Sequence, residues 1–298
     1  MRTASSQHES RSSSPRPRAA RASGPFPYRG RRALVTGASS GIGESFAREL
    51  AARGMDLVLV ARSEGKLRAL ASELAKRHGV AVEVVASDLS REGAARALHA
   101  LCAEKGLHVD LLVNNAAFGT HGPFHEAPLA RQHEQVTLNV TAVVDLSHLF
   151  LPGMVERGEG GIINVASIAA YQPLPYMATY GATKAFVLSF TEALWAEVRE
   201  RGVRVLALCP GPVETRFFDV VGTRDVAVGP MATPEQVVLA GLRGLEKGSP
   251  SLIVGLRNWV QSNLPRLFPR ELALRVTSGM MKPRTPAVLA ATSRGQLR

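Results

Sequence analysis

The sequence predicts a single doubly wound α/β domain, with a mostly parallel seven-stranded sheet and a C-terminal helical extension. Short runs rich in Val, Ile and Leu alternate six or seven times with helical stretches along the chain. These runs show no alternation of apolar and polar residues, which is typical of strands buried on both faces. Such repeated strand–helix units predict one parallel sheet covered by helices. A length of 298 residues would also accommodate two domains, but the sequence shows no internal break.

The expected elements follow one another between residues 30 and 255, which we assign to the domain itself. Strands are expected at 33–35, 57–60, 80–86, 110–113, 161–165, 203–208 and 252–254. Helices are expected at 45–53, 64–78, 92–105, 132–157, 179–201 and 234–247. Pro234 stands at the start of the last helix, where proline is favoured.

The net charge of +11 is concentrated at the two ends of the chain. Residues 1–29 carry six Arg and one acid, and residues 257–298 carry eight Arg or Lys and one acid, whereas the body between them has a net charge of −1. We therefore expect a disordered, basic Ser/Arg/Pro-rich tail at 1–29 and a basic amphipathic extension at 256–298. A nucleic-acid binder would need a basic stripe over the fold, so the near-neutral body argues against that partner.

Cysteine and histidine usage excludes two kinds of site. Cys102 and Cys209 are too few for a disulfide framework or a zinc cluster, which favours a reducing, cytoplasmic location. The histidines show no spacing with Cys or acids that predicts a metal site, so we expect none. His121 and His125 would be able to line a pocket, although solvated loop positions are the simpler interpretation.

A glycine-rich turn joins the first expected strand to the first helix. Its glycines permit a tight turn and a close approach to a pyrophosphate, and the following helix N-terminus directs free N–H groups toward phosphates. Because the turn follows a strand and opens a helix, it has the context that a dinucleotide-binding loop requires. No Lys-Ser/Thr pair follows, so it is not a Walker loop. The cofactor contacts predicted here are Gly37, Ser39, Ser40, Gly41, Ile42 and Gly43.

The end of the second expected strand indicates which dinucleotide is bound. An acid at this place would bond the ribose 2′-hydroxyl of NAD, but the strand ends in Ala61, Arg62 and Ser63. The Arg62 guanidinium is planar, permanently charged and suited to a 2′-phosphate. We therefore predict that Arg62 and Ser63 contact the cofactor and that NADP(H) is preferred, with NAD(H) possible.

Four polar residues further along the chain suit hydride transfer to a carbonyl. Tyr180 and Lys184 are one helical turn apart, and Ser167 follows the fifth strand at the carboxyl edge where an open α/β sheet binds its ligand. A neighbouring ammonium and an oxidised nicotinamide would lower the tyrosine pKa, and the serine hydroxyl would hold the substrate oxygen. Asn139 is expected to open a helix and to hold a water for proton relay.

With these motifs in place, residues 30–255 resemble the short-chain dehydrogenase/reductase family, in an NADP-preferring bacterial oxidoreductase branch. The resemblance implies a Rossmann fold, an Asn–Ser–Tyr–Lys catalytic set at Asn139, Ser167, Tyr180 and Lys184, and assembly as a homodimer or homotetramer. The cofactor contacts that it implies are Asp88, Leu89, Asn115, Ala116, Tyr180, Lys184, Pro210, Gly211, Val213 and Thr215. One departure is Ala117, where the family usually has Gly, and it affects the fine geometry beside the nicotinamide.

These observations favour an NADP(H)-dependent oxidoreductase that interconverts a carbonyl and an alcohol. The alternative is a non-catalytic relative that senses the cofactor or scaffolds a partner, which would have no need of the catalytic set. Residues 168–179 and 215–232 are expected to form the substrate pocket, and the apolar side chains in the second range suggest a hydrophobic substrate. The basic amphipathic segment at 256–282 is expected to contact a membrane surface peripherally, to pack on another subunit or to cover the pocket.

Overall fold

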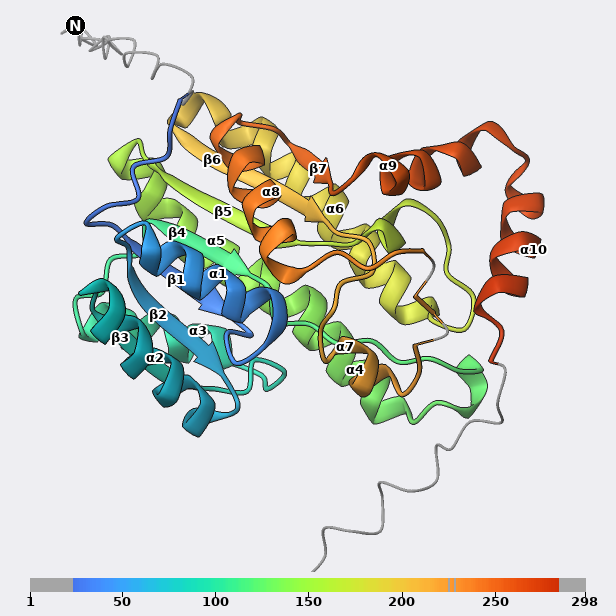
Figure 1. Cartoon of the computed structure of the whole chain (residues 1–298), viewed down its shortest axis with the longest axis horizontal. Helices are drawn as coiled ribbons and strands as arrows, with labels where there is room; N and C mark the ends of the chain where they lie inside the picture. Colours follow the sequence, from blue (N-terminus) through green and yellow to red (C-terminus); the bar gives the residue numbers. More distant parts are fainter. Residues whose placement is uncertain (1–23, 225, 228, 284–298) are drawn as a thin grey trace, which may run out of the picture.

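The computed structural model describes residues 24–224, 226–227 and 229–283. The remainder of the expected N-terminal tail and the last part of the expected extension lie outside these residues. The described chain forms one sheet with helices on both faces (Figure 1). The prediction of a single doubly wound α/β domain is therefore confirmed.

All seven strands run parallel in the order β3-β2-β1-β4-β5-β6-β7. The strands are β1 (Arg32–Thr36), β2 (Asp56–Ala61), β3 (Val82–Ala86), β4 (Leu111–Asn114), β5 (Gly160–Val165), β6 (Val203–Cys209) and β7 (Ser251–Ile253). The strand order reverses between β1 and β4, so the connections that follow these two strands leave toward opposite faces of the sheet and a crevice forms at their carboxyl ends. The glycine-rich turn after β1 opens onto this crevice.

The helices form two layers that bury the sheet. They are α1 (Gly41–Ala52), α2 (Glu64–His78), α3 (Ala94–Glu104), α4 (Leu129–Val136), α5 (Ala142–Arg157), α6 (Ala178–Val198), α7 (Phe217–Val221), α8 (Pro234–Glu246), α9 (Leu256–Asn263) and α10 (Arg270–Met281). One core cluster lies under α1, α2 and α8, and a second lies under α3, α5 and α6. Burying both sheet faces explains why the strands are continuously apolar.

Two helical predictions differ from the structure. The stretch expected as one helix at 132–157 consists of α4 and α5 joined by the π turn Thr137–Thr141. An inserted π turn leaves the apolar pattern continuous, so periodicity does not reveal it. Helix α7 lies in a region that reads as loop, because five residues are too few to show a helical period.

The domain begins earlier than residue 30. Residues 24–29 were assigned to the disordered tail, but Phe26 is buried in the core cluster under α1. The Tyr28 hydroxyl donates a hydrogen bond of 2.8 Å to Glu246, and Arg204 donates one of 2.7 Å to the carbonyl of Gly24. Two aromatic side chains bury enough apolar surface to order this short segment.

The C-terminal arm, residues 256–281, leaves the sheet after β7 and runs along the side of the molecule as α9 and α10 (Figure 1). Pro265 and Pro269 interrupt it, as the sequence predicted. At its far end, the His121 imidazole Nε2 lies 2.8 Å from the carbonyl oxygen of Met281. The arm is thus attached to the body at both ends.

The helical stretch Leu129–Arg157 is long and apolar enough to cross a membrane by length and composition, and 33% of its most apolar window is buried inside the protein. Core helices of water-soluble domains share these properties. Here Leu146, Phe150 and Met154 of α5 belong to the core cluster shared with α3 and α6. We therefore interpret this stretch as a layer of the fold.

Candidate active site

Hydrogen bonds from the residue that follows β4 fix the start of the glycine-rich turn. Asn115 follows β4, and its Nδ2 donates to the carbonyl of Thr36 at 2.9 Å and to that of Gly37 at 3.4 Å. Gly37 and Gly41 have φ values of +67° and +57°, which favour glycine. A Cβ on Gly43 would lie 2.3 Å from the Gly37 carbonyl oxygen. Only glycine therefore permits this close packing of turn and helix.

The start of α1 leaves donors available for an anion. Its N-cap Ser40 is extended and makes no side-chain capping hydrogen bond. The first N–H groups of a helix lack partners within the helix, and their dipoles favour negative charge. This cradle fits a pyrophosphate, as the sequence predicted.

One cavity of about 390 Å³ runs from this turn to the catalytic residues. The predicted cofactor residues that line it are Gly37, Ser39, Ser40, Gly41, Ile42, Arg62, Ser63, Asp88, Leu89, Asn115, Ala116, Tyr180, Lys184, Pro210, Gly211, Val213 and Thr215. Gly43 is not among the lining residues, because it packs behind the turn against Gly37. The structure therefore brings together residues from the ends of six strands.

The adenosine end of the cavity has charges of both signs. Arg62 extends from the end of β2 with 68% of its side chain exposed, and its Nη1 lies 3.9 Å from Glu134. Burial alone would raise the pKa of Asp88, but hydrogen bonds from Ser90 and the charges of Arg62 and Arg91 hold that pKa below its ordinary value. The Asp88 carboxylate is therefore ionised beside the guanidinium of Arg62.

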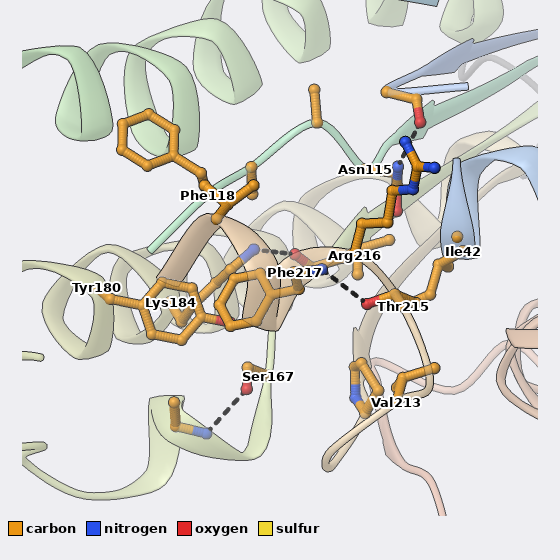
Figure 2. Close-up of a pocket in the computed structure, with 18 of the residues that line it drawn as sticks. Ile42, Asn115, Phe118, Ser167, Tyr180, Lys184, Val213, Thr215, Arg216 and Phe217 are labelled. Atoms are coloured by element: carbon orange, nitrogen blue, oxygen red, sulfur yellow. Dashed lines mark hydrogen bonds between the residues drawn. The ribbon is translucent and has the colours of Figure 1, made fainter. Parts of the chain in front are cut away.

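The predicted catalytic residues Ser167, Tyr180 and Lys184 meet at the other end of the same cavity (Figure 2). Ser167 follows β5, and its Oγ accepts a hydrogen bond of 3.1 Å from the amide of Ala169. Tyr180 and Lys184 lie one turn apart on α6, and the Lys184 Nζ is 5.9 Å from the centre of the Tyr180 ring. The ammonium donates a hydrogen bond of 2.7 Å to the carbonyl of Val165. This bond fixes the charge beneath the tyrosine.

Burial is the main cause of the pKa shifts of Tyr180 and Lys184. It raises the pKa of Tyr180 to about 12, and a hydrogen bond with Ser167 opposes this shift only in part. It also lowers the pKa of Lys184 to about 8. The protein groups alone therefore do not produce the expected fall in the tyrosine pKa. At neutral pH the phenol keeps its proton and is able to donate it.

Asn139 does not open a helix, in contrast to the sequence-based expectation. It lies inside the π turn between α4 and α5, is buried, and does not line the cavity. Its Nδ2 donates to the carbonyl of Phe118 at 2.9 Å and to Thr183 at 3.1 Å, while its Oδ1 accepts from the Phe118 amide at 3.1 Å. The Thr183 hydroxyl in turn donates to the carbonyl of Tyr180 at 2.8 Å. The side chain of Asn139 therefore positions the loop after β4 against α6.

The two predicted pocket segments both line the cavity. They contribute Ile168, Ala169, Gln172, Leu174, Met177, Thr215, Arg216, Phe217, Phe218, Val220 and Val226. Phe217 lies against the catalytic tyrosine, with ring centres 5.3 Å apart (Figure 2). The wall facing Tyr180 is therefore largely apolar.

Sequence reasoning missed several lining residues as individual contacts. They are Phe118, Leu138, Gln261, Ser262 and Met281. Arg216, which belongs to the predicted segment 215–232, points toward the loop of Asn115 (Figure 2). Gln261, Ser262 and Met281 belong to the C-terminal arm, so the arm covers the pocket, which is one of the roles expected for it. Amphipathic spacing in α9 was the available signal, but it does not show what the polar face meets.

Of the two histidines considered for the pocket, His125 is a solvated loop residue, as the simpler interpretation has it, whereas the partly buried His121 is neither solvated nor part of the cavity lining. His125 is largely exposed, with 81% of its side chain accessible, and His121 bonds the end of the arm rather than lining the cavity. Among the described residues no group of three or more His, Cys, Asp or Glu is placed to hold a metal ion.

Comparison with known proteins agrees with this geometry. The family model described as short chain dehydrogenase matches residues 31–225. Very-long-chain 3-oxoacyl-CoA reductase from Bos taurus is 37% identical over 65% of this chain and 63% of its own length, so the chain spans less than two thirds of that relative. The Macaca fascicularis protein of the same name is 33% identical over 84% of this chain and 80% of its own length.

A solved structure also resembles this chain in both sequence and fold. A short-chain dehydrogenase from Sphingobium yanoikuyae in complex with NADPH is 32% identical, covers 87% of this chain and 98% of its own, and superimposes with a TM-score of 0.73. The chain therefore belongs to the short-chain dehydrogenase family and is an oxidoreductase that acts on CH–OH and C=O groups with NAD(P)(H).

Proposed function

We propose that this protein is an NADPH-dependent reductase of hydrophobic ketones, with Tyr180 as the acid. The observation that carries the proposal is the single cavity lined by the glycine-rich turn, Arg62 and the set Ser167, Tyr180 and Lys184. Its remaining wall is formed mainly by apolar side chains from two segments and the arm. The similarity to very-long-chain 3-oxoacyl-CoA reductases also favours an apolar carbonyl substrate.

The chemistry follows from the placement of the protein groups. A bound nicotinamide supplies hydride to the carbonyl carbon. The Ser167 hydroxyl holds the substrate oxygen, on which negative charge develops during the transfer. The Tyr180 phenol, protonated because burial raises its pKa, donates its proton to that oxygen. The Lys184 ammonium, fixed by Val165, stabilises the phenolate that remains.

Cofactor preference is assigned to the end of β2. Ala61 occupies the place of the acid that would bond an NAD ribose, and the exposed Arg62 beside it is free to turn toward a 2′-phosphate. The neighbouring Glu134 carboxylate is already paired with Arg131 at 2.5 Å. Arg62 is therefore a cation available at the place of the 2′-phosphate, and NADP(H) use favours the reductive direction.

A substrate panel tests the proposal. The purified full-length protein would be mixed with NADPH and with aliphatic, aromatic, acyl-thioester and steroid ketones, and NADPH absorbance would be followed. We expect turnover with the more apolar ketones and slower turnover with small polar ones. Loss of NADPH absorbance with none of them, in a protein that binds NADPH, would support the cofactor-sensing or scaffolding alternative instead.

We also propose that the arm rests on an anionic membrane surface from the cytoplasmic side. Nine large apolar side chains of the arm are exposed: Leu256, Trp259, Val260, Leu264, Leu267, Phe268, Leu272, Val276 and Met280. Arg257, Arg266, Arg270 and Arg275 accompany them, with Glu271 as the only acid between residues 256 and 281. Apolar residues interleaved with arginines are typical of interfacial helices.

Co-sedimentation with vesicles tests this contact. We expect binding to vesicles that contain phosphatidylserine and little binding to phosphatidylcholine alone, with salt weakening it. Light scattering in the absence of lipid measures the homodimer or homotetramer that the family resemblance implies. Equal binding to both vesicle types, or burial of the arm in the oligomer, would contradict the membrane proposal.

A further inference from the structure

The cavity has a second polar region that the catalytic set does not explain. Helix α9 of the arm contributes two adjacent polar residues, Gln261 and Ser262, to the same cavity that Ser167 and Tyr180 line. Ser262 is 3% exposed, so it is a buried residue on a helix whose other large side chains lie mostly at the surface. A polar side chain in this position needs a reason.

The hydroxyl of Ser262 makes no hydrogen bond to any part of the chain that the structure describes. Its Oγ is buried and has no partner among the residues that the structure describes. Among the described residues, two other buried side chains, Asn114 and Gln135, contain a polar atom without a hydrogen-bond partner. In each of them the other polar atom of the amide does form a hydrogen bond. Asn114 donates to Asn164 at 2.9 Å, and Gln135 accepts from Thr120 at 3.0 Å. Ser262 therefore differs from both.

Local helix geometry offers the hydroxyl a partner that it does not use. Elsewhere, Thr191 and Thr277 donate to the main-chain carbonyl four residues earlier, at 2.5 and 2.8 Å. Thr277 lies on α10 of the same arm. A buried hydroxyl without a partner destabilises the folded protein, so such groups are few and call for an explanation. A ligand in the cavity is the explanation that fits its position.

The surroundings define the rest of the ligand. Leu174, Met177, Val221 and Met281 form an apolar cluster, with Phe217 and Tyr180 packed against it. Of these, Leu174, Met177, Met281, Phe217 and Tyr180 line the cavity. A substrate that touches both Tyr180 and Ser262 therefore meets mainly apolar surface between two polar points.

We propose that Gln261 and Ser262 form a recognition site for a second oxygen of the substrate, separate from the carbonyl that is reduced. The substrate class is a largely apolar ketone that carries one additional hydroxyl or carbonyl group. This inference rests on the proposed ketone reductase function and specifies its substrate. A site built to hydrogen-bond a substrate group discriminates strongly against the analogue that lacks it.

Matched ketone pairs test the site. The probes are a long-chain methyl ketone and its terminally hydroxylated derivative, and a saturated steroid ketone with and without a ring hydroxyl. We expect the wild-type protein to prefer at least one hydroxylated member by about tenfold in kcat/KM. Ser262→Ala should remove that preference by slowing the hydroxylated ketone alone, and Ser262→Thr should retain it. The KM for NADPH should not change.

Ser278→Ala is the matched control, because Ser278 lies on the same arm and does not line the cavity. It should alter neither member of a pair. An equal loss on both members in Ser262→Ala, no preference in the wild-type protein, or a raised KM for NADPH would each overturn the inference while leaving ketone reduction established. Absence of any ketone reduction would instead count against the proposed function.

Thermal unfolding tests the inference without turnover. Because the unbonded hydroxyl destabilises the ligand-free protein, Ser262→Ala should raise its Tm, whereas Ser278→Ala should not. A lowered Tm in Ser262→Ala would mean that the hydroxyl has a stabilising partner within the protein, and the proposal would then fail.

Discussion

The nucleotide-binding edge of the sheet and the C-terminal arm meet at one cavity, but they are held in different ways. At the edge, a part-buried hydrogen bond from Asn115 and a buried one from Lys184, each to a main-chain carbonyl, hold the glycine-rich turn and the ammonium in place. In the arm, nine large apolar side chains are exposed, and the far end of α10 is attached through His121. The proposed reaction chemistry thus lies where several hydrogen bonds fix the geometry, and the proposed substrate recognition lies partly in the arm, where fewer contacts do so.

Replacing the proton donor would have the largest effect on the constrained region. Tyr180→Phe removes only the hydroxyl, so we expect kcat to fall roughly 10²–10⁴-fold while NADPH still binds. NADPH absorbance measures turnover, and a fluorescence titration measures binding. Tyr176→Phe, on a neighbouring tyrosine outside the cavity lining, is the control. Undiminished reduction by Tyr180→Phe would refute the mechanism.

Burial of the Lys184 ammonium should lower the stability of the folded protein. At pH 7, Lys184→Met should raise the free energy of unfolding by about 2–3 kcal/mol and abolish activity, because burial penalises the charged form. The lowered pKa means that the folded protein releases this proton first, so wild-type stability rises with pH from about 8 toward 10.5. The advantage of Lys184→Met should shrink over that window.

Urea unfolding at pH 7 and at pH 10 measures the difference in the free energy of unfolding between Lys184→Met and the wild-type protein at each pH. Lys76→Met, on the exposed side of α2, is the matched control and should change little. A stability gain for Lys184→Met that is the same at both pH values would show that the ammonium is not the source of the penalty.

The cofactor assignment predicts a smaller change at the rim of the constrained region. Arg62→Ala should raise the KM for NADPH about tenfold or more and leave the KM for NADH nearly unchanged, because only NADPH carries the 2′-phosphate. Arg68→Ala removes an exposed arginine paired with Glu64 on the following helix and is the control. Equal effects of Arg62→Ala on both cofactors would contradict NADP(H) preference.

Substitutions in the exposed face of the arm should have the smallest effect on the free energy of unfolding. Leu267 is 80% exposed, so Leu267→Ser should alter the free energy of unfolding by no more than about 0.5 kcal/mol. The same change should weaken binding to phosphatidylserine vesicles. Leu146→Ser in the buried face of α5 shows the opposite limit, a strongly destabilised protein. A large loss of stability in Leu267→Ser would mean that the two regions do not differ as described.

The sequence predicts the sheet, the glycine-rich turn and the lining of the cofactor site because these depend on local order along the chain. Strand and helix alternate, and a strand end such as Ala61–Arg62 places its side chains at the ligand edge. The predicted α2 agrees with the structure at both ends, since Gly79 with a φ of +69° marks where it stops. At these places the local sequence pattern and its position between a strand and a helix predict the same structure.

Features that depend on contacts far apart in the sequence were not predictable. Phe26 was assigned to the polar N-terminal tail because the residues it packs against in the core lie far away in the sequence. The polar face of α9 gives no sign that Ser262 is enclosed, because the elements that enclose it come from elsewhere in the chain. The dominance of burial over charge in the Tyr180 pKa also requires knowledge of the packing.

The π turn at Thr137–Thr141 also restricts how the gene can change. A π turn accommodates one more residue than the α-helix around it, so a single-codon deletion there could heal into a regular helix. Because the π turn absorbs its extra residue by widening locally, that repair would leave α4 and α5 in nearly the same rotational phase. Asn139 lies within the turn, however, and its hydrogen bonds to Phe118 and Thr183 depend on its place there. An in-frame deletion should therefore disturb the link between the loop after β4 and α6 more than the packing of α4.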